Sequence, residues 1–197
     1  MKEVKSLGKI YATSDLHLCH NKPFVYEARG FDSIEEMNEE YVKRWNDTVN
    51  EEDDVYVLGD LVLNDPEVGI EYLKKLKGKI HIVLGNHDTP RKQQMYAELP
   101  NVVEIAWAIM LRYKKYHFFL THFPCLTANG DKESLKEMTL NLHGHTHQLE
   151  DFTGDNYCMY HVGVDSHYGY PVCIDDIITD MKGNYENYLN QKKNTEN

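Results

Sequence analysis

Five short polar clusters, each placed directly after an apolar run, constrain this chain more than any other feature. In chain order they are Asp15-Leu16-His17, Gly59-Asp60, Gly85-Asn86-His87-Asp88, Thr121-His122 and Gly144-His145-Thr146-His147. The apolar runs have the length and composition of buried strands. In open α/β sheets, ligands bind beyond the carboxyl ends of the strands, so the clusters are expected to converge in space. Burying so many polar groups without a partner would be costly, and we therefore expect them to form a binding site.

The segments between the clusters predict alternating strands and helices. Strands are expected at 9–14, 54–58 and 79–84, and a capping-box pattern at Ser33 and Glu36 opens a helix that runs through Asn50. Two more helices are expected, one from Asp65-Pro66 to Gly78 and one over 91–99. The later elements are strands at 102–105, 106–111, 116–121, 139–142 and 157–164, a turn at 168–171 and a helix from about Asp175. This order predicts an α/β fold, a four-layer sandwich of two mixed β-sheets flanked by helices, with hairpin-like later strands.

Length and composition favour one domain. We expect it to cover residues 1–190 of the 197, followed by a polar C-terminal tail over 191–197. No apolar run approaches the ~18 residues of a membrane helix, and the N-terminal residues show no secretory signal, so a cytoplasmic protein without a membrane partner is expected. The net charge of -11 argues against an extended nucleic-acid footprint. The cysteines form no CxxC pair and are expected to be free thiols; they are Cys19, Cys125, Cys158 and Cys173.

The clusters, taken together, resemble the signature of the calcineurin-like metallophosphoesterases, and the match runs from Ile10 to His147. The chain is most similar to the small stand-alone bacterial and phage phosphoesterases of that superfamily. The resemblance implies the metallophosphoesterase fold and two divalent transition-metal ions, bridged by Asp60. The first metal would be bound by Asp15, His17, Asp60 and His147, and the second by Asp60, Asn86, His122 and His145. Mixed nitrogen and oxygen ligands suit Mn, which we favour, and also Fe, Zn or Ni.

The resemblance also implies a reaction, in which a metal-bridging hydroxide attacks phosphorus while the cations neutralise the phosphoryl oxygens. His87 would act on the leaving-group side, with Asp88 placed to orient it. The alternative for His87 is a structural histidine beside the metals. Arg29, His20 and Asn21 follow the first cluster and are candidates for substrate contact, because an arginine fork can grip a phosphate oxygen. An ordinary solvated Arg29 is the alternative. The remaining histidines in predicted strands are expected to be hydrogen-bonded structural residues; they are His81, His117, His143 and His161.

The residues after the second cluster narrow the choice of substrate. Leu63-Asn64-Asp65 stands where protein phosphatases and dinucleoside tetraphosphatases of the superfamily carry Asp-Arg-Gly, which argues against phosphoprotein substrates. The lack of sequence for a second domain argues against a large DNA-repair nuclease. We expect a small phosphoester, a class that includes nucleotides, and favour diesters over monoesters. The alternatives are a catalytically silent scaffold of the same fold and a metal-binding protein without turnover. The oligomeric state stays open.

Overall fold

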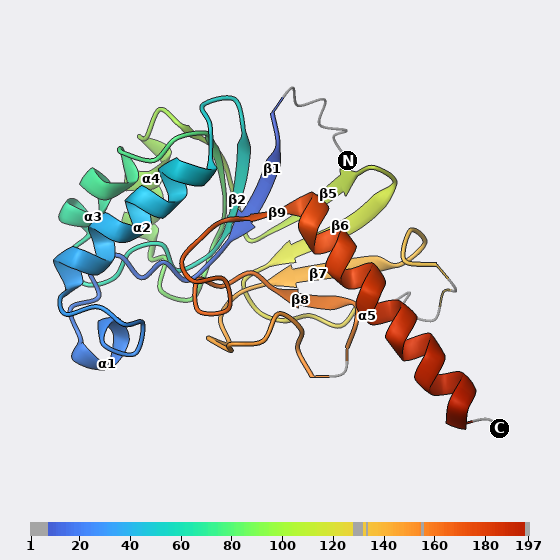
Figure 1. Cartoon of the computed structure of the whole chain (residues 1–197). Helices are drawn as coiled ribbons and strands as arrows, with labels where there is room; N and C mark the ends of the chain where they lie inside the picture. Colours follow the sequence, from blue (N-terminus) through green and yellow to red (C-terminus); the bar gives the residue numbers. More distant parts are fainter. Residues whose placement is uncertain (1–7, 128–131, 133, 155, 196–197) are drawn as a thin grey trace.

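The first sheet contains the parallel strands that the sequence predicts. The computed structural model describes residues 8–127, 132, 134–154 and 156–195. In this sheet the strand order is β4-β3-β2-β1-β9 (Figure 1). The strands are β1 (Ile10–Thr13), β2 (Asp54–Leu58), β3 (Lys79–Val83), β4 (Val102–Ala106) and β9 (Val172–Cys173). Strands β1 to β4 pair in parallel, whereas β9 runs antiparallel to β1. Every residue of β1 and β2 is buried, as in a sheet that is covered on both faces.

Two short elements are absent from the prediction. Strand β9 pairs with Tyr11 and Ala12 directly before the final helix, α5 (Ile174–Thr195), begins. Helix α1 (Pro23–Tyr26) is a single turn in the loop that follows the first polar cluster. Two residues cannot show strand alternation and four cannot show helical periodicity, so the sequence pattern holds no signal for either element.

Three helices follow the first three strands, and a side-chain cap sets the start of each one. They are α2 (Ile34–Thr48), α3 (Pro66–Leu73) and α4 (Pro90–Ala97). The side chains of Ser33, Asp65 and Thr89 accept hydrogen bonds from the amides three residues later. The starts of α2 and α3 agree with the predicted caps, and α4 begins one residue before the predicted range 91–99, but α3 ends at Leu73, before the predicted end at Gly78.

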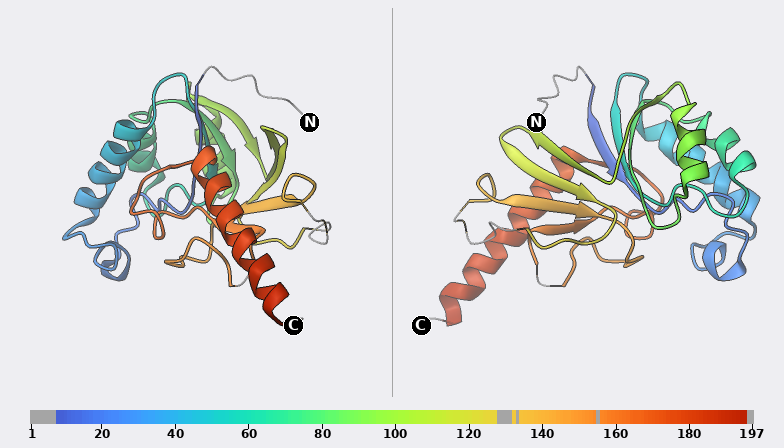
Figure 2. Two further views of the ribbon diagram at one scale, coloured as in Figure 1. Left: turned by 45° about the vertical axis from the view of Figure 1, so that its right-hand side comes forward. Right: turned by 180° about the vertical axis from the view of Figure 1, so that it is seen from behind.

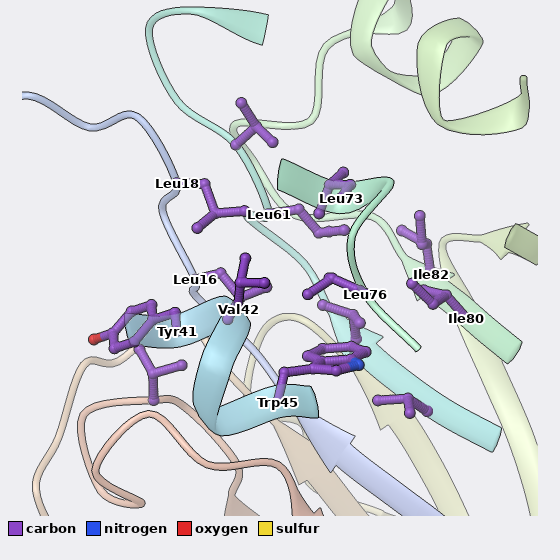
Figure 3. Packing of buried hydrophobic residues seen from close by; sticks show 14 of the residues in the cluster. Leu16, Leu18, Tyr41, Val42, Trp45, Leu61, Leu73, Leu76, Ile80 and Ile82 are labelled. Carbon is purple, nitrogen blue, oxygen red and sulfur yellow. The ribbon is translucent and has the colours of Figure 1, made fainter. Parts of the chain in front are cut away.

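One hydrophobic core lies between these helices and the first sheet. Trp45 of α2 is 1% exposed, and its indole nitrogen donates to the carbonyl oxygen of Lys77 at 2.9 Å. Figure 3 shows Trp45 beside Leu76, with Ile80 of β3, Leu16 and Leu18 in the same cluster. Leu16 and Leu18 belong to the loop after β1, so this core also anchors the loop that carries the first polar cluster.

The second sheet has the order β5-β6-β7-β8. Its strands are β5 (Ala108–Tyr113), β6 (Tyr116–Thr121), β7 (Thr139–His143) and β8 (Met159–His161). Strands β5 and β6 form an antiparallel hairpin, but β6–β7 and β7–β8 pair in parallel. The prediction that the later strands are hairpin-like is therefore wrong beyond β6. Long connections carry the chain back after β6 and β7, as parallel pairing requires.

Helix α5 completes the second core. The hydroxyl of Tyr113 in β5 donates to Asp175, and the hydroxyl of Tyr160 in β8 donates to Asp180, so α5 crosses the second sheet from one edge strand to the other (Figure 2). Its residues Ile177 and Met181 share a buried cluster with inward-facing side chains of both sheets. Both sheets are mixed and flanked by helices, which confirms the predicted α/β class.

The C-terminal helix runs further than the sequence indicates. Helix α5 continues to Thr195, through most of the segment that is predicted as a polar tail, and residues 191–194 are exposed. The outermost ends of the predicted domain and tail, 1–7 and 196–197, lie outside the described residues. All four cysteines are free thiols, as expected. Within the described ranges, every helix is too short or too polar to cross a membrane.

Candidate metal centre

The first two polar clusters meet because their loops are hydrogen-bonded to each other. The amide of Asp15 donates to the carbonyl oxygen of Gly59, and the amide of His17 donates to that of Asp60, both at 3.0 Å. The side chains between them, such as Leu16, are buried in the first core. The loop therefore directs apolar residues inward and polar residues to the edge of the sheet.

Five of the seven predicted ligands have positive φ angles. The residues are Asp15 (57°), His17 (49°), Asp60 (55°), His145 (69°) and His147 (49°). Residues other than glycine rarely adopt this left-handed conformation, and it persists only where the surrounding structure enforces it. Such residues concentrate at functional sites, where backbone strain positions the side chains.

A first ligand group consists of Asp15, His17 and His147, each of which offers one ligand atom within 4.8 Å of the others. Oδ1 of Asp15 lies 3.8 Å from Nε2 of His17 and 3.8 Å from Nε2 of His147. Both Oδ1 of Asp15 and Nε2 of His17 are buried without a hydrogen-bond partner among the described residues. Buried polar atoms are normally paired, so these two atoms fit the ligand set of a cation.

A second ligand group consists of Asp15, Asp60 and His122. Nδ1 of His122 donates to the carbonyl oxygen of Leu58 at 2.8 Å, which leaves a lone pair on Nε2. This Nε2 lies 2.9 Å from Oδ1 of Asn86 and 3.4 Å from Oδ2 of Asp60. Three acceptors converge with no proton donor among them, an arrangement that suits a shared cation.

Asp60 belongs to the second group and also reaches the first. Its Oδ2 is 3.8 Å from Nε2 of His17 in the first group and 3.4 Å from Nε2 of His122 in the second. Its other oxygen accepts the amide of His87 at 2.9 Å. The carboxylate is almost completely buried, and this position is the one that the resemblance assigns to the bridging ligand.

His145 lies beside the second group. Its amide donates to Oδ2 of Asp15 at 2.9 Å, and its ring centroid is 5.0 Å from that of His122. Burial lowers the pKa of His145 and also that of His17, which favours the neutral imidazole that a metal needs. Burial alone would raise the pKa of Asp15, but His17 and the hydroxyl of Ser14 hold this pKa well below its usual range. These shifts favour an ionised Asp15 beside neutral His17 and His145.

Asp165 is a site residue that sequence reasoning missed. It lies in the loop after β8, and its Oδ2 accepts a hydrogen bond from Nδ1 of His147 at 2.7 Å. Burial alone would raise the pKa of Asp165, but His147 and Arg29 lower it to about 2, while the hydrogen bond that His147 donates to Asp165 raises the pKa of His147. The bond fixes the ring so that Nε2 faces Asp15.

Arg29 is neither a free phosphate fork nor a solvated arginine. Its side chain is 6% exposed and forms a two-point ion pair with Asp165 at 2.9 and 3.0 Å. It also donates to the carbonyl oxygens of Asp15 and Leu16 at 3.0 and 3.2 Å. These contacts use the hydrogen-bond donors of the guanidinium within the protein, and they link the first cluster to the loop after β8.

His87 and Asp88 do not form the predicted pair. The His87 side chain is 48% exposed, with Nε2 4.0 Å from Oδ2 of Asp60, so it stands at the open side of the centre. Asp88 is buried and accepts hydrogen bonds from the amides of Asp60 and Gly85 and from the hydroxyl of Tyr96. The predicted role of Asp88 in orienting His87 is wrong, because the carboxylate instead fixes the loop of Asp60.

Two glycines of the clusters are explained by close packing. A Cβ atom on Gly85 would lie 2.7 Å from the amide nitrogen of Asp60 and closer still to its carboxylate. A Cβ atom on Gly144 would lie 2.7 Å from Cβ of Ser14 and would press on the carboxylate of Asp15. The backbone therefore approaches both carboxylates more closely than any other residue type permits.

The other two predicted substrate contacts differ in position. His20 lies beside the centre, with its ring stacked on that of His17 at a centroid distance of 5.5 Å. Burial and the neighbouring His17 lower the pKa of His20 to about 4. Asn21 is exposed, and its amide donates to the carbonyl oxygen of Cys19. Only His20 of this pair is thus placed next to a predicted ligand.

The histidines expected to be structural are found in the sheets. His143 and His161 are wholly buried, and His143 is hydrogen-bonded to the carbonyl oxygen of Gly144 and the hydroxyl of Thr153. His81 lies between two carboxylates of the first sheet. These positions agree with hydrogen-bonded structural roles.

The chain is similar to several known proteins. A family model described as the calcineurin-like phosphoesterase superfamily domain matches residues 9–165. An uncharacterized protein of Methanocaldococcus jannaschii is 36% identical over 151 residues, 75% of each chain. The Gene 66 protein of Mycobacterium phage D29 is 27% identical over 183 residues, 81% of this chain and 89% of the phage protein. A protein of unknown function from Aquifex aeolicus shares the fold, with a TM-score of 0.64 and 19% identity over 87% of this chain and 98% of that one. The chain therefore belongs to the calcineurin-like phosphoesterase superfamily.

Proposed function

We propose that this chain hydrolyses a small phosphoester with the help of two divalent metal ions. The observation that carries the proposal is the position of Asp60, whose Oδ2 lies 3.8 Å from Nε2 of His17 and 3.4 Å from Nε2 of His122. A single carboxylate between two ligand groups is what two neighbouring cations need. The buried, unpaired Oδ1 of Asp15 and Nε2 of His17 support the same assignment.

The bound cations would supply an activated water and neutralise charge on the phosphoryl oxygens. Histidine nitrogens, carboxylates and the amide oxygen of Asn86 form a mixed ligand set, which favours Mn, with Fe, Zn or Ni as alternatives. His147 is held in place for this role by Asp165, and His122 by the carbonyl oxygen of Leu58.

His87 is the proposed catalytic acid. Its backbone amide is held by Asp60, while its ring is half-exposed beside the same carboxylate. A ring in this position meets the leaving-group oxygen of a phosphoester bound at the centre and donates a proton to it. A histidine donor serves both diesters and monoesters, and we favour diesters. Two cations at the buried Asp15 and Asp60 would also make the centre attractive to phosphate although the chain carries a net charge of -11.

The test combines a metal count with turnover. The protein is loaded with Mn(II), bound metal is quantified by mass spectrometry, and hydrolysis of bis-p-nitrophenyl phosphate and p-nitrophenyl phosphate is followed. We expect two metals per chain and hydrolysis of at least the diester. Asp60→Asn should lose metal and activity together, whereas Asp175→Asn, at an exposed ion pair with Lys114, should retain both.

The alternatives predict other results. Two bound metals without hydrolysis of either ester or of a nucleotide panel would indicate a metal-binding protein without turnover. Failure to bind metal with the fold intact would indicate a silent scaffold and would contradict the proposal.

A further inference from the structure

A pocket of about 450 Å³ opens directly beside the first ligand group. His17 and His147 form the side next to the centre, and Phe24, Val25 and Leu149 are among the residues that form the rest. Helix α1 supplies Phe24 and Val25, and the loop after β7 supplies Leu149. We call this the α1 pocket; its volume is typical of a site for a small molecule.

The wall of the α1 pocket exposes large apolar side chains. Phe24 is 73% exposed and Leu149 is 76% exposed, although they come from segments far apart in the chain. The ring of Phe24 stands edge-on to that of His20, with centroids 6.0 Å apart. Single exposed apolar residues are common, but two around one pocket beside a polar centre indicate a binding surface for an apolar group.

The charged groups of the α1 pocket are already paired with each other. Arg29 and Asp165 line the pocket, and both guanidinium bonds to the carboxylate lie at 2.9 to 3.0 Å. Asp165 also holds His147. A charged ligand group would have to compete with this ion pair, so an uncharged group is the better match.

We propose that the α1 pocket binds an uncharged aromatic ring attached to the phosphate, so that the preferred substrates are aryl phosphoesters. This inference rests on the proposed function, since it places the phosphate at the metal centre. His17 and His147 are shared by the pocket and the first ligand group, so one molecule can reach both. A flat ring suits the edge of Phe24 and the apolar side chain of Leu149.

The test measures binding of two phosphonates, whose C–P bond this chemistry does not cleave. Calorimetry with the Mn(II)-loaded protein compares phenylphosphonate with methylphosphonate. We expect phenylphosphonate to bind about tenfold more tightly, because the ring is removed from water against apolar side chains. Phe24→Ala and Leu149→Ala should each reduce this preference to about threefold or less and leave the affinity for methylphosphonate unchanged.

Matched variants control for loss of an exposed apolar residue. Tyr188→Ala on α5, 39% exposed, and Val103→Ala on β4, 54% exposed, should keep the full preference. Phe123 is 49% exposed and contacts the ring of His145 on the other side of the centre. If Phe123→Ala abolishes the preference and Phe24→Ala does not, the ring binds elsewhere and the inference is overturned.

The failure of this inference can be separated from failure of the proposed function. Equal affinities of the unaltered protein for the two phosphonates, in a preparation that hydrolyses phosphoesters, would overturn the α1 pocket alone. Loss of the proposed function would appear as absent metal binding or absent hydrolysis in the same preparation.

Discussion

The carboxylate of Asp165 accepts a hydrogen bond from Nδ1 of His147 at 2.7 Å, on the side of the ring opposite to the nitrogen that faces Asp15. The Asp165 side chain is 13% exposed and is also held by Arg29. A carboxylate behind a histidine fixes the ring and its tautomer and makes the free nitrogen a better ligand. Asp165 is thus a positioning residue for the first ligand group.

Replacing Asp165 by asparagine should weaken metal binding. Without the carboxylate, the ring of His147 loses its fixed orientation, and we expect the affinity for Mn(II) to fall by about 10- to 100-fold. Titration of the metal-free protein with Mn(II) measures this change, and Asp175→Asn is the matched control at an exposed ion pair. An unchanged affinity in Asp165→Asn would show that the hydrogen bond does not position the ring.

Asp165 also illustrates what the sequence pattern does not contain. The five clusters were predictable because each one follows a strand long enough to show an apolar run. Asp165 follows β8, which has only three residues, and it reaches His147 only because β7 and β8 pair in parallel. That pairing is a tertiary feature, and hairpin-like strands were expected instead. The sequence points to Arg29 but not to its partner Asp165, so it does not indicate that the guanidinium is held within the protein.

The helices show the same division between local and tertiary information. The starts of α2 and α3 are predictable from the caps Ser33 and Asp65, because a cap acts within four residues, whereas the sequence analysis assigns no cap to α4, which Thr89 caps in the structure. The sequence predicts that Asp88 orients His87, because the two residues are neighbours in the chain. Its carboxylate instead reaches the amide of Asp60, a contact across 28 positions that no local pattern encodes.

Gly85→Ala should destabilise both the fold and the centre. The added methyl group would lie 2.7 Å from the amide nitrogen of Asp60, which has no room to move because Asp88 holds it. We expect a loss of about 1–3 kcal/mol in the free energy of unfolding, measured with urea, and weaker metal binding. Gly183→Ala in α5 is the control, since nothing lies within 4 Å of its added methyl group. This variant should gain up to about 1 kcal/mol from helix propensity. Equal stabilities of the two variants would contradict the packing argument.

His161 should make the protein less stable in mild acid. Burial, aided by His143, lowers the pKa of His161 to about 4 in the folded protein, from about 6.5 when unfolded. Above pH 6.5 the ring is neutral in both states and has no effect. Between pH 6.5 and 4 only the unfolded chain takes up the proton, so stability falls as the pH falls, by up to about 3 kcal/mol. Urea unfolding of metal-free protein at pH 7.5 and 5 measures the loss, which should be smaller in His161→Asn. The same loss in that variant would assign it to another group.

His87→Ala should separate metal binding from turnover. The His87 side chain is half-exposed and lies outside both ligand groups, so removing it should leave two metals bound. If the ring donates the proton to the leaving group, kcat for the diester should fall by about 100-fold or more. The decrease should be smaller for an ester with a more acidic leaving group, since that group departs with less help. His117→Ala on β6 is the matched control and should leave kcat unchanged. Full turnover in His87→Ala would make His87 a structural histidine and would leave the metal ions to stabilise the departing oxygen alone.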